Sequence, residues 1–133
     1  SLATTLTMRC RAPVRDLSGQ TSLKVLAAVL RRAQLFVGND SGVMHLAVAV
    51  GTPVVAVFGL SNHRAWGPYG GVTWPAANGP HVIVRRELPC SPCLYRGHQL
   101  GSRTGCASRH CLTGLAVAPV LAAATNILGR RGR

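Results

Sequence analysis

Apolar residues recur at helical spacing through the segment "TSLKVLAAVLRRAQ", which begins at Thr21. Thr21 or Ser22 can cap its first turn, and two arginines lie near its end, where the helix dipole favours cations. The pattern predicts an amphipathic helix. The residues on its apolar face are Leu23, Leu26, Ala27 and Leu30.

Two short apolar runs follow, "QLFVG" and "TPVVAVFG", each ended by glycine, and both are typical of buried strands. The segment between them, "SGVMHLAVAVG", is apolar on every side. As a helix it would need covering on all its faces. A strand, a helix and a strand in so few residues predict a βαβ unit with parallel strands and a right-handed crossover.

The flanking segments complete an α/β pattern. "APVRDLSG" and "HVIVRR" are expected to be further strands, and residues 59–80 form a loop rich in Gly, Pro and Asn. The last helix is predicted in "APVLAAATNILGRRGR", with Pro119 in its first turn and Gly129 as its C-cap. The fold class is therefore α/β with a Rossmann-like parallel sheet.

The composition is that of one folded domain. Of the 133 residues, 47% are hydrophobic and 14% are charged, a balance typical of a packed core. Because the chain begins at Ser1 without an initiator methionine or a signal segment, we expect a fragment of a longer protein. Pro53 and Pro119 interrupt the longest apolar runs, which fall short of the roughly 20 residues that cross a bilayer, so no transmembrane helix is predicted.

The net charge is strongly positive. Fifteen Lys and Arg residues against three Asp and Glu give a formal charge of +12. Such a surface attracts nucleic acid, nucleotide phosphates or an anionic membrane face. Only one of the fifteen is Lys, so a genome biased in base composition is an equal alternative.

The turn "GNDSG", residues 38–42, joins the first apolar run to the apolar helix. The first N–H groups of a helix are unpaired and its dipole favours negative charge there, so the turn is a candidate anion site. Gly42 allows close approach to the backbone, and Ser41 offers a hydroxyl donor. His45 comes three and four residues later, on the same helix face, and the arrangement suits a diphosphate.

Asp40 is the exception, because a carboxylate repels phosphate. We expect it to cap the helix, to order the loop amides or to accept a hydrogen bond from a sugar hydroxyl. Two simpler interpretations stay open. Asp or Ser before a helix is typical of a plain N-cap, and a single His in an apolar helix is typical of a core residue.

Four of the five cysteines fall in residues 90–111, a cysteine-bearing loop segment. Their spacing, C-x2-C, twelve residues, then C-x4-C, is compatible with tetrahedral structural zinc, to which His98 or His110 could add a ligand. Free thiols are the alternative that we favour over zinc, and disulfides are disfavoured in a reducing cytosol. The four residues are Cys90, Cys93, Cys106 and Cys111, and Cys10 is an unpaired thiol.

An ordered set of motifs resembles glycosyltransferase family 9, the heptosyltransferases that build the inner core of bacterial lipopolysaccharide. The set is "DLSGQTSLKVLAAVLRRAQLFVGNDSGVMHLAVAVGTPVVAVFG", then "WGPYG", "CSPC" and a later "CL". Its most specific part is D-[ST]-G-x-x-H, here Asp40 to His45, followed by G-x-P and [FY]-G. The family often has prolines where this chain has Leu60 and His63, which alters the loop that faces the sugar.

The resemblance implies a GT-B architecture, in which residues 1–133 form a truncated C-terminal domain that binds the nucleotide sugar. The N-terminal acceptor domain, which carries the catalytic base in the family, is expected to be absent, so no catalytic residue is assigned here. By match to the family motif, Asp40, Ser41, Gly42 and His45 contact the donor diphosphate. The main chain of Thr21 matches a position beside the nucleobase.

The resemblance further implies transfer of heptose from ADP-heptose to a lipid A–core acceptor, with no required cofactor and no nucleic-acid partner. A cytoplasmic enzyme, in peripheral contact with the anionic inner face of the inner membrane, would fit this role. The fragment alone is expected to be inactive. Two alternatives remain: a zinc-stabilised basic nucleic-acid-binding module, and an inactive nucleotide-binding remnant.

Overall fold

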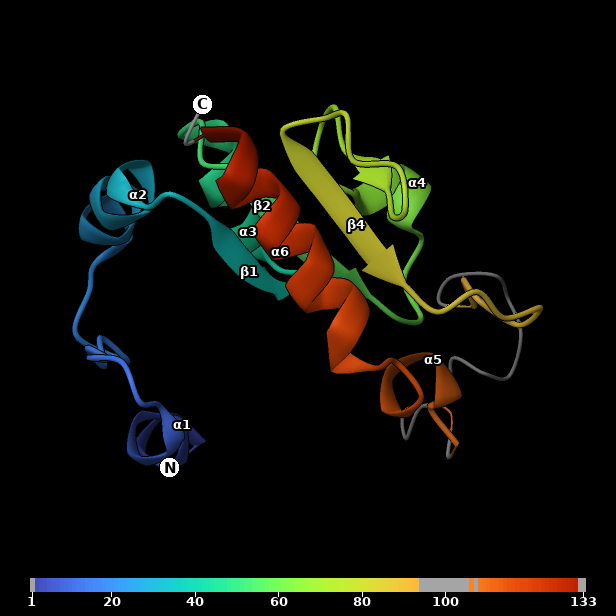
Figure 1. Ribbon diagram of the computed structural model, residues 1–133, viewed down its shortest axis with the longest axis horizontal. Coiled ribbons are helices and arrows are strands. Elements are labelled where there is room, and N and C mark those ends of the chain that lie inside the picture. The colour runs from blue at the N-terminus through green and yellow to red at the C-terminus, as the bar shows by residue number, and fades with distance from the viewer. Residues whose placement is uncertain (1, 94–105, 107, 132–133) are drawn as a thin grey trace.

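A computed structural model describes residues 2–93, 106 and 108–131 of the chain. Helices and strands alternate through most of this part, and Figure 1 shows a sheet with α6 lying across it. The elements are α1 (Leu2–Arg9), α2 (Leu23–Arg32), β1 (Phe36–Asn39), α3 (Gly42–Ala49), β2 (Val54–Phe58), α4 (His63–Trp66), β3 (Val72–Thr73), β4 (His81–Arg85), α5 (His110–Thr113) and α6 (Val117–Arg131).

The four described strands form one parallel sheet in the order β1-β2-β4-β3. In this sheet β2 pairs Val54 with Phe36 of β1 on one side and with His81 of β4 on the other. A central strand that is covered on both faces needs an apolar residue at every position, which the run "VVAVF" provides. The predicted α/β fold with a Rossmann-like parallel sheet is confirmed.

Alternate residues of β2 point into two separate hydrophobic cores. On one face, Val54, Ala56 and Phe58 pack with residues of α2 and α3. On the other face, Val55 packs with Ala123 and its neighbours on α6. Burying a side chain the size of Phe58, which is fully enclosed, stabilises the fold by about 1.5–3 kcal/mol.

Both ends of α3 follow from the sequence. Ser41 is the N-cap, and at the other end Gly51 adopts a positive φ of 82° that a residue with a side chain rarely takes. The N–H of Gly51 bonds the Val48 carbonyl at 3.0 Å, and the N–H of Thr52 bonds the Ala47 carbonyl at 2.9 Å. This pair of bonds is a Schellman motif, and it turns the chain directly into β2.

A buried hydrogen bond ties α2 to the turn after α3. The Thr52 hydroxyl donates to the Leu30 carbonyl at 2.6 Å, and Thr52 is almost completely enclosed. The Leu30 carbonyl also accepts the N–H of Ala33 at 2.9 Å, so the Thr52 hydroxyl uses the second lone pair of this oxygen. The Thr52 bond therefore fixes the two helices on the same face of the sheet.

Three of the sequence predictions need correction. The helix α3 is not covered on all faces, since Val43 is 38% exposed and His45 is exposed. Residues 12–19 form no strand, because the Asp16 carboxylate accepts the Ser18 N–H at 2.9 Å and Gly19 turns the chain with a positive φ. Gly129 is not a C-cap, since α6 continues through it to Arg131.

The predicted loop at residues 59–80 contains two short elements, α4 and β3, that the sequence did not indicate. Near the N-terminus α1 has no buried residue and lies apart from the sheet in Figure 1. Among the described helices, none combines the length and the apolar character needed to span a bilayer.

Candidate functional site

The carboxyl ends of β1, β2 and β4 lie along one edge of the sheet, because these strands are parallel. The Asp40 turn follows β1, the Gly59–His63 segment follows β2, and Glu87 follows β4. Ligands of open α/β sheets bind in the crevice outside this edge. The edge is therefore the first place to seek a site.

Ser41 closes the first turn of α3. Its Oγ accepts the N–H of Met44 at 3.4 Å, and its carbonyl accepts the N–H of His45 at 3.3 Å. The N–H groups of Gly42 and Val43 form no hydrogen bond with any described residue. Two backbone donors at the positive end of the helix dipole are thus available to an anion.

Asp40 does not cap α3, so that prediction is wrong. The residue is half-buried, and its carboxylate makes no hydrogen bond within the described part of the chain. A role in accepting a hydrogen bond from a sugar hydroxyl stays a prediction.

The N-terminus of α3 is open to solvent. Gly42, Val43 and His45 are exposed, and a Cβ added at Gly42 would meet no described heavy atom within 4 Å. The interpretation of His45 as a core residue is therefore wrong. Its imidazole lies on the helix face of Ser41 and Gly42, where a docked anion would meet it.

Thr21 lies at a different helix from the other four predicted residues. It is half-buried and directly precedes Ser22, whose Oγ accepts the N–H of Val25 at 3.3 Å and so caps α2. The structure brings Asp40, Ser41, Gly42 and His45 together by their adjacency in sequence. The nucleobase role of the Thr21 main chain stays a prediction.

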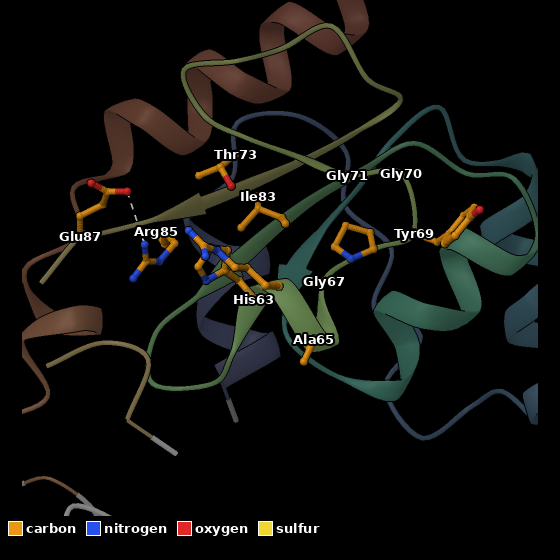
Figure 2. Close-up of a pocket in the computed structure, with 12 residues that line it drawn as sticks. His63, Ala65, Gly67, Tyr69, Gly70, Gly71, Thr73, Ile83, Arg85 and Glu87 are labelled. Atoms are coloured by element: carbon orange, nitrogen blue, oxygen red, sulfur yellow. Dashed lines mark hydrogen bonds and ion pairs between the residues drawn. The ribbon is translucent and has the colours of Figure 1, made fainter. Parts of the chain in front are cut away.

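A polar cavity of about 640 Å³ lies on the sheet face beside α4. Figure 2 shows His63 and Arg85 side by side within it, Glu87 at one end and Tyr69 at the other. Its wall comes from α4, from the 67–71 turn and from β4, with Ile83 contributing an apolar surface.

Arg85 connects this cavity to the cysteine-bearing loop. Its Nη2 donates to the Ser91 carbonyl at 3.1 Å and to the Ser91 Oγ at 3.3 Å, while Nη1 lies 3.5 Å from the Glu87 carboxylate. The Ser91 hydroxyl in turn donates to the Gly59 carbonyl at 2.7 Å. The side chain of Arg85 is only 8% exposed, so it fixes the Ser91 turn against the end of β2.

The surroundings of His63 lower its pKa and so favour the neutral imidazole. Burial lowers its pKa below the ordinary value of 6.5, the Arg85 and Arg64 guanidinium groups lower the pKa further, and Glu87 opposes them. Its Nδ1 is buried and has no hydrogen-bond partner among the described residues. Because this nitrogen is enclosed, a ligand in the cavity would contact other parts of the His63 side chain and not Nδ1.

Sequence reasoning missed this cavity. In the sequence, His63 stands out only as a departure from a family proline, and Arg85 only as one of the fifteen basic residues. A usable signal was present, because both residues lie at or just beyond the carboxyl end of a predicted strand. The packing of α4 against β4 could not be anticipated, because α4 itself was not predicted.

The four predicted cysteines of the loop segment line a second, apolar cavity of about 370 Å³. Cys93 and Cys111 are buried in it, and Cys90 and Cys106 are at least partly exposed. Burial raises the pKa of the Cys93 thiol, and the neighbouring thiols of Cys111, Cys90 and Cys106 raise that pKa further. All five cysteines of the chain are free thiols.

Cys106 has the opposite shift. Its sulfur lies 3.1 Å from the Ser108 hydroxyl, and this hydrogen bond lowers the pKa of the Cys106 thiol, helped by the backbone N–H groups of Arg109 and Ser108. Within the described residues, no three His, Cys, Asp or Glu side chains are arranged to hold a metal ion. His98, named with the zinc hypothesis, lies outside the described residues.

Comparison with known proteins places this chain in a family. The family model described as glycosyltransferase family 9 (heptosyltransferase) matches residues 1–102. No solved structure matches the chain.

Three curated relatives illustrate the similarity. Lipopolysaccharide heptosyltransferase 3 of Escherichia coli K12 is 42% identical over 78 residues, which are 57% of this chain and 23% of the relative. Lipooligosaccharide heptosyltransferase 2 of Campylobacter jejuni is 29% identical over 117 residues, 86% of this chain and 32% of the relative. Lipopolysaccharide heptosyltransferase 1 of Pseudomonas aeruginosa is 36% identical over 75 residues, 56% of this chain and 19% of the relative. The chain thus spans a third or less of the length of each of them.

Proposed function

The chain belongs to glycosyltransferase family 9, and we propose that it supplies the donor diphosphate-binding half of a heptosyltransferase. The whole protein would transfer heptose from ADP-heptose to the lipid A–core acceptor of lipopolysaccharide. The names of the relatives support heptose as the sugar and lipopolysaccharide or lipooligosaccharide as the product. GT-B architecture and work at the cytoplasmic face of the inner membrane belong to the same proposal.

The observation that carries the proposal is the open N-terminus of α3. Gly42 and Val43 present two unused N–H groups, and the exposed His45 lies on the same helix face. These donors lie at the carboxyl edge of a parallel sheet, the usual place for a nucleotide in this kind of fold. A diphosphate can accept hydrogen bonds from all of them at once.

In the transfer reaction, negative charge grows on the leaving diphosphate as the bond from the sugar C1 to oxygen breaks. The N–H groups of Gly42 and Val43 and the His45 imidazole would stabilise that charge, because they are oriented before the reaction starts. A base of the whole protein would deprotonate the acceptor hydroxyl. The chain's own part is to bind the leaving group and to hold its charge.

Calorimetric titration of the 133-residue chain with ADP tests the site. We expect ADP to bind more tightly than AMP, because AMP lacks the second phosphate. His45→Ala should weaken ADP binding about ten- to a hundredfold, the effect of losing one hydrogen bond to a charged group. His110→Ala is the matched control, since His110 is also exposed but belongs to α5.

Unchanged ADP affinity in a folded His45→Ala variant would contradict the assignment. Tighter binding of single-stranded DNA than of ADP at the same salt concentration would favour the nucleic-acid alternative. A heptose-transfer assay on the whole protein then separates an active enzyme from an inactive remnant. Binding of ADP without any transfer would identify the remnant.

A further inference from the structure

The cavity beside α4 has features of a binding site in its own right. It lies on the β4 side of the sheet, and none of its lining residues belongs to the Asp40–His45 group at the end of α3. We propose that it binds an anionic sugar, a sugar ring that carries a phosphate or a carboxylate, through Arg64, Arg85 and Tyr69. ADP tests the donor site and glucose 6-phosphate tests this cavity, so the two inferences can fail separately.

The charge in the cavity calls for an anion. Arg64 and Arg85 both line it, and Glu87 is the one carboxylate among the lining residues. Glu87 is paired with Arg85, whereas the Arg64 guanidinium makes no ion pair or hydrogen bond with a described residue. A free guanidinium beside a second, fixed one is a favourable arrangement for a phosphate or a carboxylate.

Arg64 is held at the cavity by its backbone. The Asn62 side chain caps α4 by accepting the Arg64 N–H at 3.1 Å. The side chain itself remains exposed and free to turn toward a ligand. Arg85, by contrast, is immobilised by Ser91, so it offers a charge in a fixed position.

An aromatic ring at the rim points to a sugar and not to phosphate alone. Tyr69 is 92% exposed and lines the end of the cavity away from Glu87 (Figure 2). Its ring stands on the 67–71 turn, where Gly70 has a positive φ of 73°. A rigid aromatic ring beside polar groups can pack on the apolar face of a sugar while the hydroxyl groups find polar partners.

The rest of the lining suits hydroxyl groups. Thr73 contributes a hydroxyl that can donate a hydrogen bond to a sugar hydroxyl or accept one from it. A volume of about 640 Å³ is far more than an inorganic phosphate ion needs and is within the range of small-molecule sites. Polar groups, an aromatic rim and excess positive charge together indicate an acidic or phosphorylated sugar.

Nuclear magnetic resonance titration of the chain with glucose 6-phosphate tests the inference, with glucose, inorganic phosphate and AMP as comparison probes. We expect glucose 6-phosphate to shift the amide signals of the 63–71 and 83–87 segments and to bind at least about tenfold more tightly than glucose or phosphate. Glucuronic acid, a carboxylate-bearing sugar, should bind at the same signals.

Two variants and one control locate the site. Arg64→Ala should weaken glucose 6-phosphate binding about tenfold, because it removes the cation, and Tyr69→Ala should weaken it several-fold, because it removes the ring. Both side chains are exposed, so neither substitution leaves a hole in the core. Arg31→Ala removes the same charge from the exposed end of α2 and should change the affinity less than about twofold. Arg85 is left intact, since its loss would also release the Ser91 turn.

Four results would overturn the proposal. If phosphate binds as tightly as glucose 6-phosphate, the cavity is a simple anion site. If glucose 6-phosphate does not bind at all, the cavity is not a binding site. Equal effects of Arg64→Ala and Arg31→Ala would mean non-specific attraction to a chain of charge +12. If AMP binds more tightly than glucose 6-phosphate, and Tyr69→Ala abolishes AMP binding, the cavity is a nucleotide site instead.

Discussion

Gly42 is the residue at which a ligand can come closest to the backbone of α3. A Cβ at this position would meet no described atom within 4 Å, so Gly42→Ala is compatible with the fold. The substitution should leave stability unchanged or raise it by about 0.5–1 kcal/mol, since alanine is the better helix former. The same methyl group would stand between the helix N–H groups and a diphosphate.

We therefore predict that Gly42→Ala separates binding from stability. ADP affinity should fall about tenfold or more, because two hydrogen bonds to the anion become longer. Calorimetric titration measures the affinity, and a thermal melt measures the stability. Loss of both together would mean that Gly42 serves the fold and not the ligand.

His81 governs a pH dependence of stability. It is 7% exposed at the start of β4, and burial lowers its pKa below the ordinary value of 6.5. In the unfolded chain this histidine therefore takes up a proton at a higher pH than in the folded chain. Neutral His81 therefore makes its full contribution to the free energy of unfolding above pH 6.5. This contribution is lost as the pH falls from 6.5 toward the lowered pKa.

The prediction is that the melting temperature falls between pH 7 and pH 5 and that His81→Val reduces this fall. Valine suits a buried strand position and does not titrate. The pKa of His63 is also lowered and adds an effect of the same sign, so the fall will not vanish. His110→Ala is the control, and equal pH dependence in the His81→Val variant and the parent chain would contradict the prediction.

The residues of the α3 end could be predicted because they are neighbours in sequence. The spacing from Ser41 to His45 fixes a shared helix face without any knowledge of tertiary structure. The cavity beside α4 could not be predicted in this way. Arg64 and Arg85 are 21 positions apart in the sequence, and only the tertiary structure brings α4 and β4 to the same cavity.

At the scale of elements, prediction succeeded where the local signal and the burial agreed. The run "VVAVF" is apolar at every position because β2 is covered on both faces. The strand predicted at residues 12–19 does not form, because the Asp16 carboxylate accepts a backbone N–H and stabilises a turn that competes with strand pairing. At Gly129 the glycine signal for a helix end was overridden, since α6 continues along the sheet face.

The cysteine-bearing loop gives a prediction at the same scale. We expect free thiols, with Cys93 and Cys111 slow to react because they are buried. Cys106 should be alkylated at a lower pH than free cysteine, since the Ser108 hydrogen bond favours its thiolate. Iodoacetamide labelling followed by mass spectrometry of the peptides measures each rate, and Ser108→Ala should bring Cys106 back toward the behaviour of free cysteine.

The zinc hypothesis makes a different prediction for the same experiment. A zinc ion held by the four thiols would protect all of them equally and would give a Co²⁺ derivative with thiolate charge-transfer absorption. The arrangement of the described residues does not favour it, since no three such side chains are placed to hold a metal ion. Equal protection after addition of Zn²⁺ would contradict our expectation of free thiols.

At the scale of the whole molecule, the charge of +12 is the dominant property. Of the three acidic residues, Glu87 already has an arginine partner, so most of the basic side chains have no acidic residue available to them. A surface of this kind is attracted to an anionic membrane by about 1 kcal/mol for each basic residue near the lipid headgroups. Such an attraction would bring the chain to the membrane that the proposed function assigns to the glycolipid acceptor.

We predict that the chain binds vesicles that contain phosphatidylglycerol at low salt and not vesicles of phosphatidylcholine. Binding should fall steeply as the salt concentration is raised toward about 1 M, where the Debye length shrinks to about 3 Å. A double variant, Arg31→Gln with Arg32→Gln, removes two exposed charges at the end of α2 and should shift the vesicle titration to higher lipid concentration. Cosedimentation measures the bound fraction. If the chain does not bind anionic vesicles at low salt, the membrane explanation of its positive charge is wrong, and the base composition of the genome remains as the explanation.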